Sequence, residues 1–468
     1  MFQRAWLNHA WFQNAWRLCS MMLVVGLLVA CAPAAAPAEP AAEATAPAGG
    51  ATTEEASAAD GEPVQMSFWM NYNFSEAVNE LVRTQVQEWA DANNVEIDIL
   101  IAPDADLDTR WSAGLEAPET LPDVSVVFAQ WLPRFYDAGL LLDVSDTYAT
   151  LNELEGGFFP AAGEVVTVQG VQYGVPYIGS VTPAYWRTDA LETAGLSAPP
   201  ATYDEMKDFC SKVNDPGVFW CYGLGFGGFS DPEVQMRNLL WSFGGMVTAE
   251  DGVTIALDSP ETLAVLNWLV EMNEMGSFPP DFLVGDDSTN NNWYQTRSVA
   301  AIVNTGSVLS WMDENDPELK ELTILTPSPA GPAGIHAAGG FGAVLGVFNT
   351  TEHPELAKSL LESFASPEQV WARSEAVNFG NLPVHVNAAN DPVWDDPYLR
   401  PFIDQLQYVH PTGWPGPGTT AAYEVQNQQV LTRMAVRVLS GEQTPEESLA
   451  QAVEEVEKIY TEFPPTVQ

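Results

Sequence analysis

Basic residues are scarce in this chain of 468 residues. Only 17 Lys and Arg stand against 63 Asp and Glu, which gives a formal net charge of −46. Nucleic-acid binding requires a basic face that neutralises phosphates, so this balance argues against a nucleic-acid partner. An acidic membrane surface would also repel so acidic a protein. We therefore expect no nucleic-acid partner and no direct adsorption to a membrane.

The chain also lacks the common local motifs of catalysis. It has no Gly-x-Ser-x-Gly elbow and no phosphate-binding loop that ends in Gly-Lys. Gly223-x-Gly225-x-x-Gly228 fits the dinucleotide pattern, but Asp231-Pro232 interrupts it before the next helix, which favours a loop. From these absences we expect a protein without cofactor or catalytic residue. We also expect no metal site, because no metal-ligand spacing relates the histidines beyond residue 30, at positions 336, 353, 385 and 410.

Cysteine is rare as well, with four residues, and two of them lie near the start of the chain. Residues 1–30 carry Arg4 and Arg17, no acidic residue and an apolar run over 21–30, which is the pattern of a secretory signal. Leu28-Val-Ala-Cys31 resembles the lipobox of bacterial lipoproteins, which implies cleavage before Cys31 and lipidation of its thiol. A signal peptide with an incidental cysteine is the alternative. Residues 31–63 are rich in Ala, Pro and Glu and are expected to form a disordered tether.

The other two cysteines, Cys210 and Cys221, flank the turn-forming run Asn214-Asp-Pro-Gly217. In the oxidising compartment expected for an exported protein they can form a disulfide. Two buried thiols are the alternative.

Residues 64–468 are too many for one typical domain and suit two. Strand-like runs at 64–70, 95–101 and 123–128 alternate with helical patterns, which is typical of an α/β domain with a largely parallel sheet. No segment after the signal is long and apolar enough to cross a membrane. Capping boxes are predicted at three helix starts: Asn73 with Glu76, Thr202 with Glu205, and Thr444 with Glu447.

The stretch 170–186 consists of two apolar runs that small residues separate and that Pro176 and Pro183 punctuate. We interpret it as an extended segment that leaves one domain and enters another. Backbone torsion is freest at Gly179-Ser180, so we expect a hinge there, with Tyr177 at the bottom of a cleft. A hairpin within one domain is the alternative.

Residues 293–306 resemble a motif of the family 1 extracellular solute-binding proteins, the sugar-binding lipoproteins of ABC importers. Tyr294, the run 300–302 and Gly306 match the motif, whereas Arg297-Ser298 and Ser307-Val308 replace the family's Gly-Lys and Pro-Trp. The resemblance extends over about residues 64–460, through further matching stretches in the family's order at 121–143, 170–205, 339–342, 354–357, 382–383 and 439–441.

This resemblance implies a two-lobed periplasmic-binding-protein-like α/β fold of type II, in which two mostly parallel sheets flanked by helices are joined by a multi-segment hinge. The first lobe is expected at 64–180 and 340–385, and the second at 181–339 and 386–468. The implied function is capture of a mono- or oligosaccharide by hinge closure and its delivery to an ABC permease. We expect an extracytoplasmic monomer on a lipid anchor. A lipid-anchored glycosidase with paired carboxylates, or the solute-binding component of a sensory system, is the alternative.

A sugar offers C–H faces to aromatic rings and hydroxyls to amides and carboxylates. Aromatic and amide residues follow the first and third predicted strands, at the edge where α/β sheets bind ligands. The expected ligand set is Trp69, Asn71, Tyr72, Gln130, Trp131, Tyr177, Asn304, Gly306, Gly340, Phe341 and Trp414. Trp241 and Phe229 are weaker candidates, and an anionic group on the ligand would find Arg110, Arg134 or Arg187.

Overall fold

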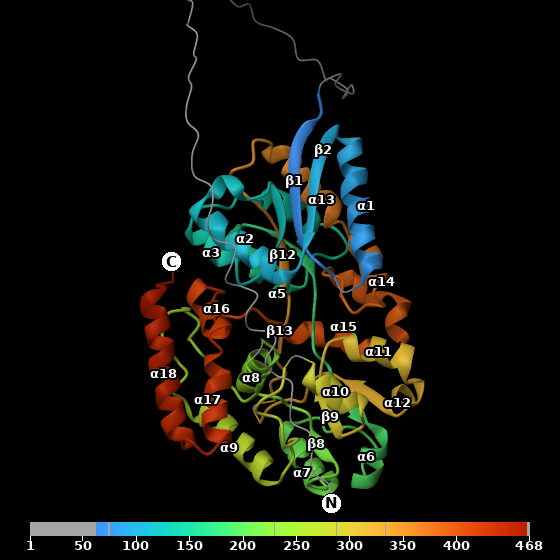
Figure 1. Cartoon of the computed structure of the whole chain (residues 1–468), viewed down its shortest axis with the longest axis vertical. Helices are drawn as coiled ribbons and strands as arrows, with labels where there is room; N and C mark the ends of the chain where they lie inside the picture. Colours follow the sequence, from blue (N-terminus) through green and yellow to red (C-terminus); the bar gives the residue numbers. More distant parts are fainter. Residues whose placement is uncertain (1–61, 74, 229, 287, 333, 466–468) are drawn as a thin grey trace, which may run out of the picture. The chain divides into compact units, whose positions relative to one another are not determined.

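The computed structural model describes residues 62–465, apart from 74, 229, 287 and 333. These residues belong to one compact unit, 60–468, in which helices and strands are mixed (Figure 1). The expected signal sequence, Cys31, nearly all of the tether and Phe229 lie outside the described residues.

A five-stranded sheet in the order β2-β1-β3-β12-β6 forms the centre of the first lobe. β1 pairs in parallel with β2 and β3, whereas β12 is antiparallel to β3 and β6. The sheet is more mixed than the sequence pattern predicted, because β12 carries the chain back from the second lobe and therefore runs opposite to its neighbours. The strands are β1 (Val64–Asn71), β2 (Val95–Ala102), β3 (Val124–Phe128), β6 (Val175–Ile178) and β12 (Ala343–Val347).

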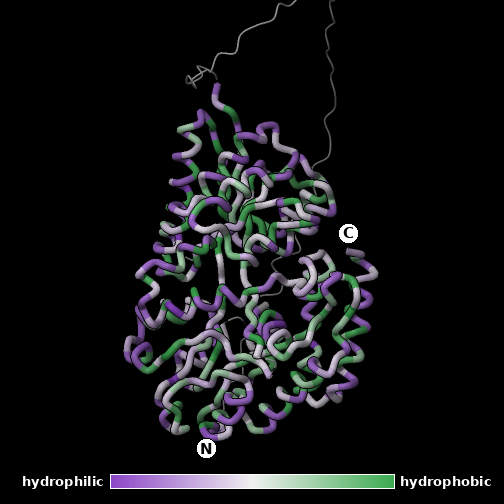
Figure 2. The backbone as a smooth tube through the Cα atoms, turned by 180° about the vertical axis from the view of Figure 1, so that it is seen from behind, coloured by the Kyte–Doolittle hydropathy of each residue, from purple (hydrophilic) through white to green (hydrophobic). Residues whose placement is uncertain are grey.

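Helices cover this sheet and bury one face each. In α13 the buried residues Ala357, Leu360, Leu361 and Phe364 recur at helical spacing, and hydrophobic and hydrophilic residues alternate along the helices (Figure 2). The elements around the sheet are α1 (Glu76–Ala92), α2 (Asp104–Glu116), η1 (Pro118–Thr120), α3 (Leu132–Asp137), α4 (Ser145–Asn152), α5 (Pro160–Val166), the hairpin β4 (Thr167–Val168) and β5 (Val171–Gln172), α13 (Pro354–Phe364) and α14 (Pro367–Glu375).

A four-stranded sheet in the order β10-β7-β9-β8 forms the centre of the second lobe. β7 is antiparallel to β10 and β9, and β8 is parallel to β9. The strands are β7 (Ala184–Arg187), β8 (Trp220–Tyr222), β9 (Val299–Val303) and β10 (Thr323–Thr326). The helices are α6 (Thr188–Ala194), α7 (Tyr203–Val213), α8 (Ser230–Ser242), α9 (Pro260–Glu274), α10 (Thr289–Gln295), α11 (Ser307–Asn315), α12 (Pro317–Glu321), α16 (Thr420–Asn427), α17 (Val430–Leu439) and α18 (Pro445–Glu462).

Three crossing segments, residues 179–183, 327–342 and 376–410, connect the two sheets. The last two pair with each other through β11 (Ala338–Gly339) and β13 (Val409–His410). The third crossing also contains η2 (Val386–Asn390), η3 (Pro392–Asp395), α15 (Arg400–Gln405) and η4 (Leu406–Tyr408). Val386 and Asn387 donate backbone hydrogen bonds to Gly157 and Glu155. Residues 386 and 387 thus still contact the first lobe, and the boundaries expected for the two lobes stay predictions.

Local signals in the sequence set several helix starts. The capping box of Thr444 and Glu447 is present at α18, and Thr202 accepts from the Glu205 amide at α7. The box predicted for Asn73 and Glu76 is wrong: α1 begins at Glu76 itself, and the Asn73 side chain accepts from the Ser75 amide instead. The side chain of Asn73 therefore stabilises a turn before the helix instead of capping the helix itself.

A disulfide joins Cys210 on α7 to Cys221 on β8, with their Cα atoms 5.1 Å apart. It ties a helix of the second lobe to the neighbouring strand of its sheet. Within residues 62–465, leaving out the four positions named above, no helix is long and apolar enough to span a membrane.

Candidate functional site

Crossing segments meet at positions where only small residues fit. Gly179 and Leu382 exchange backbone hydrogen bonds of 2.9 Å. A Cβ added to Gly340 would lie 2.6 Å from the Ser180 carbonyl oxygen, so glycine allows the first and second crossings to touch. Phe341, next to it, has a φ of 58°, a strained value for a residue with a side chain. The junction between the lobes is therefore tightly determined.

A cleft opens beside these crossings and encloses about 870 Å³, part of it continuous with solvent. Both lobes and the crossings supply its walls: Ala129, Gln130, Ser180, Thr182, Asp231, Val234, Gln235, Arg237, Asn238, Trp241, Thr305, Gly339, Gly340, Phe341, Gly342, Thr412, Tyr423 and Gln426.

Helix α8 lines this cleft with buried polar atoms that find no hydrogen-bond partner in the described part of the chain. The side-chain oxygens of Gln235 and Asn238, the Nε of Arg237 and the Nε1 of Trp241 are buried without a hydrogen bond among the described residues. Leaving a buried polar group unpaired costs about 1–3 kcal/mol. Two acceptors and two donors on one helix, all belonging to residues of the cleft wall, are therefore suited to a polar ligand that supplies their partners.

The charge of Arg237 is compensated from behind the cleft wall. Glu233, one turn earlier on α8, lies 3.7 Å from the guanidinium and is fully buried. Its carboxylate also accepts from the amides of Leu431 and Thr432 at the start of α17. Burial raises the pKa of Glu233 and lowers the pKa of Arg237, because both charged forms lose hydration. Arg237 thus offers a donor to the cleft with its charge already countered.

Aromatic rings complete the cleft. Trp241 and Phe341 are 1% exposed and Tyr423 is 4% exposed. Burial raises the pKa of Tyr423 to about 12, so its hydroxyl stays protonated at neutral pH. Trp414 lies behind Trp241, with its ring 5.7 Å from the Trp241 ring and stacked at 4.0 Å on His410. These rings give apolar faces beside the unpaired polar atoms.

The sequence of residues 84–401 matches the model of the family described as bacterial extracellular solute-binding protein. This match covers more than half of the chain. The chain belongs to this family of solute-binding proteins.

Relatives and solved structures agree with this assignment. The chain is 23% identical to the maltotriose-binding protein of Pyrococcus abyssi over 76% of its own length and 74% of that protein. A binding protein of Brucella abortus is 26% identical, and the matched region covers 60% of this chain and 66% of that relative, just under two thirds of its length. The solved structure of the sugar-binding protein MalE from Xanthomonas citri superposes with a TM-score of 0.74 at 19% identity, covering 85% of this chain and 98% of that one. The α/β fold of two lobes is thereby confirmed.

Three of the residues expected to bind ligand, Gln130, Gly340 and Phe341, line the cleft of this solute-binding protein, and the weaker candidate Trp241 does so too. Gln130 follows β3 in the first lobe, and the other three come from a crossing and from α8. The structure thus brings together residues that are far apart in the sequence.

The aromatic residues at the ends of β1 and β3 lie elsewhere. Trp131 is 4% exposed in a core with Trp111 and Phe135, and its Nε1 donates to Asp108 at 2.7 Å. Trp69 packs in the same core under the guanidinium of Arg110. Tyr72 is 42% exposed, and Asn71 contacts Asp104. These side chains face α2 and the surface rather than the wall of the cleft.

Tyr177 also lies apart from the cleft. It is 2% exposed inside the first lobe, where its ring stacks on Phe364 and lies under the guanidinium of Arg373. Helices cover both faces of this sheet, so a ring on β6 is buried in either direction, and the expected place at the bottom of a cleft is wrong for Tyr177.

Asn304, Gly306 and Trp414 support the cleft from outside its wall. Asn304 donates to Asn290 at 3.1 Å and accepts from the amide of Thr305, which does line the cleft. Gly306 approaches Gly380 of the third crossing, where a Cβ would lie 3.0 Å from the neighbouring Cα. The predicted ligand contacts of these three residues stay predictions.

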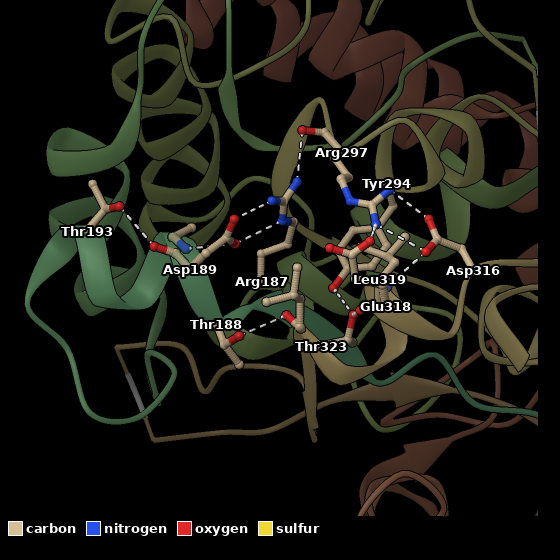
Figure 3. A network of polar contacts seen from close by, with 12 residues as sticks. Arg187, Thr188, Asp189, Thr193, Tyr294, Arg297, Asp316, Glu318, Leu319 and Thr323 are labelled. Atoms are coloured by element: carbon tan, nitrogen blue, oxygen red, sulfur yellow. Dashed lines mark hydrogen bonds and ion pairs between the residues drawn. The ribbon is translucent and has the colours of Figure 1, made fainter.

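Two arginines of the second lobe, Arg187 and Arg297, are held by ion pairs and hydrogen bonds within that lobe (Figure 3). Arg187 pairs with Asp189 and donates to the Arg297 carbonyl at 3.0 Å. Arg297, which stands where the family has Gly-Lys, makes a bidentate pair with Asp316 at 2.7 and 3.1 Å. Asp316 in turn accepts from the Leu319 amide at the start of α12. This network holds the turn before β9, so the departure from the motif has a structural reason.

Sequence reasoning missed the polar stripe of α8 and the α16 residues of the cleft. Asp231, Gln235 and Asn238 recur at spacings of four and three residues, which places them on one helical face with Trp241. A polar face on a helix whose other residues are buried was the available signal. Among the residues that the structure describes, no group of three His, Cys, Asp or Glu side chains is arranged to hold a metal ion.

Proposed function

We propose that this protein is the extracytoplasmic binding component of an ABC importer and that it captures a carbohydrate in the cleft. The observation that carries the proposal is the set of unpaired atoms on α8 beside Trp241, Phe341 and Tyr423. Hydroxyl groups donate as well as accept, so a sugar satisfies both kinds of unpaired atom, and its C–H faces cover the rings. The compensated charge of Arg237 favours an uncharged ligand.

The comparisons support the same class of ligand. Besides the maltotriose-binding relative, a solved structure from Thermotoga lettingae with bound alpha-D-tagatose superposes with a TM-score of 0.69 at 20% identity, covering 85% of this chain. A relative from Salmonella typhimurium, 26% identical over 37% of this chain and 38% of its own length, binds sn-glycerol-3-phosphate. A phosphorylated polyol is therefore the natural competitor in any ligand screen.

Transport follows from closure of the lobes on the ligand, a state that a permease distinguishes from the open one. The lipid anchor at Cys31 belongs to this proposal, because it would keep the binding protein beside its permease. Labelled palmitate should enter the wild-type protein in the cells that produce it and be absent from a Cys31→Ser variant. Equal labelling of both proteins would remove the anchor from the account.

A thermal-shift screen tests the ligand class. Neutral mono- and oligosaccharides should raise the melting temperature, whereas sugar phosphates should raise it less. The ligand should be recovered unchanged after incubation. Release of hydrolysis products at a catalytic rate would favour the glycosidase alternative instead, and a shift by sugar phosphates alone would overturn the neutral-sugar proposal.

A further inference from the structure

We infer that the cleft has a second compartment, beyond the ion pair of Arg134 and Glu424, which receives further rings of an oligosaccharide. This inference rests on the proposed function, because it names which carbohydrates the same site prefers. It concerns the side of the cleft where α3 of the first lobe faces α16 of the second.

The two helices touch across the lobes. The guanidinium of Arg134 pairs with the carboxylate of Glu424, and Thr420 donates to Asp137 at 2.7 Å. The two residue pairs, 134 with 424 and 137 with 420, follow one another in opposite order along α3 and α16, so the helices are antiparallel neighbours.

Cavities lie at both ends of this contact. Gln130, Tyr423 and Gln426 border the cleft described above, at one end. At the other end lies a second cavity with about 640 Å³ of empty space, part of it continuous with solvent. It is lined from the first lobe by α3 and the β4–β5 turn and from the second lobe by residues 417–420. Arg134 and Glu424 line neither cavity, but the residues before and after them in the sequence line one cavity or the other, so we place the ion pair between the two cavities.

The second cavity has the chemistry of a sugar subsite. The ring of Tyr136 is half-buried and held at 5.0 Å by Tyr173, so one ring face is supported from behind. Pro133 and Pro417 add apolar surface, and the wall also contains hydroxyl and carboxylate groups, from Thr167, Thr420 and Asp137. An aromatic ring beside hydroxyls and a carboxylate suits the C–H face and the hydroxyls of a further ring.

The ion pair between Arg134 and Glu424 can open. Arg134 and Glu424 come from different lobes, so their contact breaks whenever the lobes separate. The Arg134 side chain keeps 26% of its surface exposed and also rests on the Trp131 ring at 4.9 Å, which holds it when Glu424 moves away. A ligand confined to the first cavity leaves the ion pair in place, whereas a longer one replaces it with hydrogen bonds to its own hydroxyls.

Affinity measured against chain length tests this inference. Glucose and its α-1,4, β-1,4 and β-1,3 oligomers of two to four units are titrated calorimetrically into the purified protein. In the series that binds, affinity should rise by about tenfold or more when the chain becomes long enough to pass the ion pair, as an added aromatic contact of about 1.4 kcal/mol requires.

Tyr136→Ala should remove that increase and leave the affinity for the shortest binding sugar unchanged. Tyr398→Ala, on a half-buried ring that contacts Lys320 rather than either cavity, is the matched control and should not alter the length dependence. Equal affinity at all lengths, or an equal loss at all lengths in Tyr136→Ala, would overturn the second compartment while leaving carbohydrate binding intact. No binding by any member of the three series would overturn both.

Discussion

At the scale of a single residue, replacement of Trp241 should affect ligand affinity more than stability. Its ring is 1% exposed, and its Nε1 lacks a partner among the described residues. Trp241→Phe keeps an aromatic ring and removes an N–H that donates to none of the described residues. We expect a loss of carbohydrate affinity of about tenfold, the value of one hydrogen bond of about 1.4 kcal/mol, with the free energy of unfolding reduced only by the smaller ring.

Trp268→Phe is the matched control for this experiment. Trp268 is buried in the same lobe, but its Nε1 donates to the Tyr203 carbonyl oxygen at 3.2 Å. Its replacement should lower the free energy of unfolding by about 1–3 kcal/mol more than that of Trp241, because the Tyr203 carbonyl is left unpaired, and should leave affinity unchanged. Calorimetry and urea unfolding measure both quantities. A loss of affinity in Trp268→Phe, with unchanged affinity in Trp241→Phe, would contradict the role given to α8.

Single residues of the site were partly predictable. Gln130, which follows a predicted strand, and Phe341, which lies in a stretch that resembles the family, both line the cleft. Trp69 and Trp131, which were predicted from strand ends as well, lie in a core instead. The sequence places a ring after a strand but does not fix its rotamer, and both tryptophans turn toward α2, where Trp111 offers a core. The place predicted for Tyr177 is wrong for a different reason, because α13 and α14 cover its face of the sheet.

At the scale of the elements, the crossings depend on their glycines. Gly340→Ala would press a methyl group against the Ser180 carbonyl at 2.6 Å and the Val409 side chain at 3.0 Å. We expect a loss of about 1–3 kcal/mol in the free energy of unfolding, the usual cost of overpacking, together with weaker carbohydrate binding.

Gly342→Ala, two residues later in the sequence, is the control for stability, since nothing lies within 4 Å of the added Cβ. Thermal unfolding of both variants measures the difference. Equal behaviour of the two variants would show that the contact between the crossings does not matter.

The ion pair between α4 and α13 predicts a pH dependence. Lys358 donates to Asp146 at 2.8 Å, which lowers the pKa of Asp146. Because the folded-state pKa is depressed, this carboxylate stabilises the fold above its unfolded pKa of about 4, and the contribution is lost as the pH falls through the folded-state value. Asp146 is 66% exposed, so we expect less than about 1 kcal/mol.

Lys358→Gln should therefore lower the free energy of unfolding, measured in urea, at pH 7 and have little effect at pH 2. A larger effect at the lower pH would contradict the assigned direction of the pKa shift.

Elements were more predictable than the site they build. The three strands expected near the start of the chain appear as β1, β2 and β3, and the cap at Thr444 begins α18. Alternation and caps are local properties, so a single sequence carries them. The antiparallel placement of β12 and the cleft-facing stripe of α8 depend on how distant segments meet, and local periodicity does not contain that information.

At the scale of the whole molecule, α3 of the first lobe contacts α16 of the second lobe through an ion pair and a hydrogen bond. Glu424→Gln combined with Thr420→Val would remove the ion pair and the hydrogen bond to Asp137. We expect the radius of gyration of the unliganded protein, measured by small-angle X-ray scattering, to increase and a bound carbohydrate to reverse the increase. Lys207→Gln, which breaks a pair with Glu271 inside the second lobe, should leave the radius unchanged.

The most direct test of the account is calorimetric titration of the purified protein with the carbohydrate that gives the largest thermal shift. We expect saturable binding of one ligand per chain, abolished or strongly weakened when Gln235, Asn238 and Trp241 are replaced together by Leu, Leu and Phe in a variant that still folds. Binding that survives this triple replacement, or the absence of any carbohydrate that binds, would contradict it.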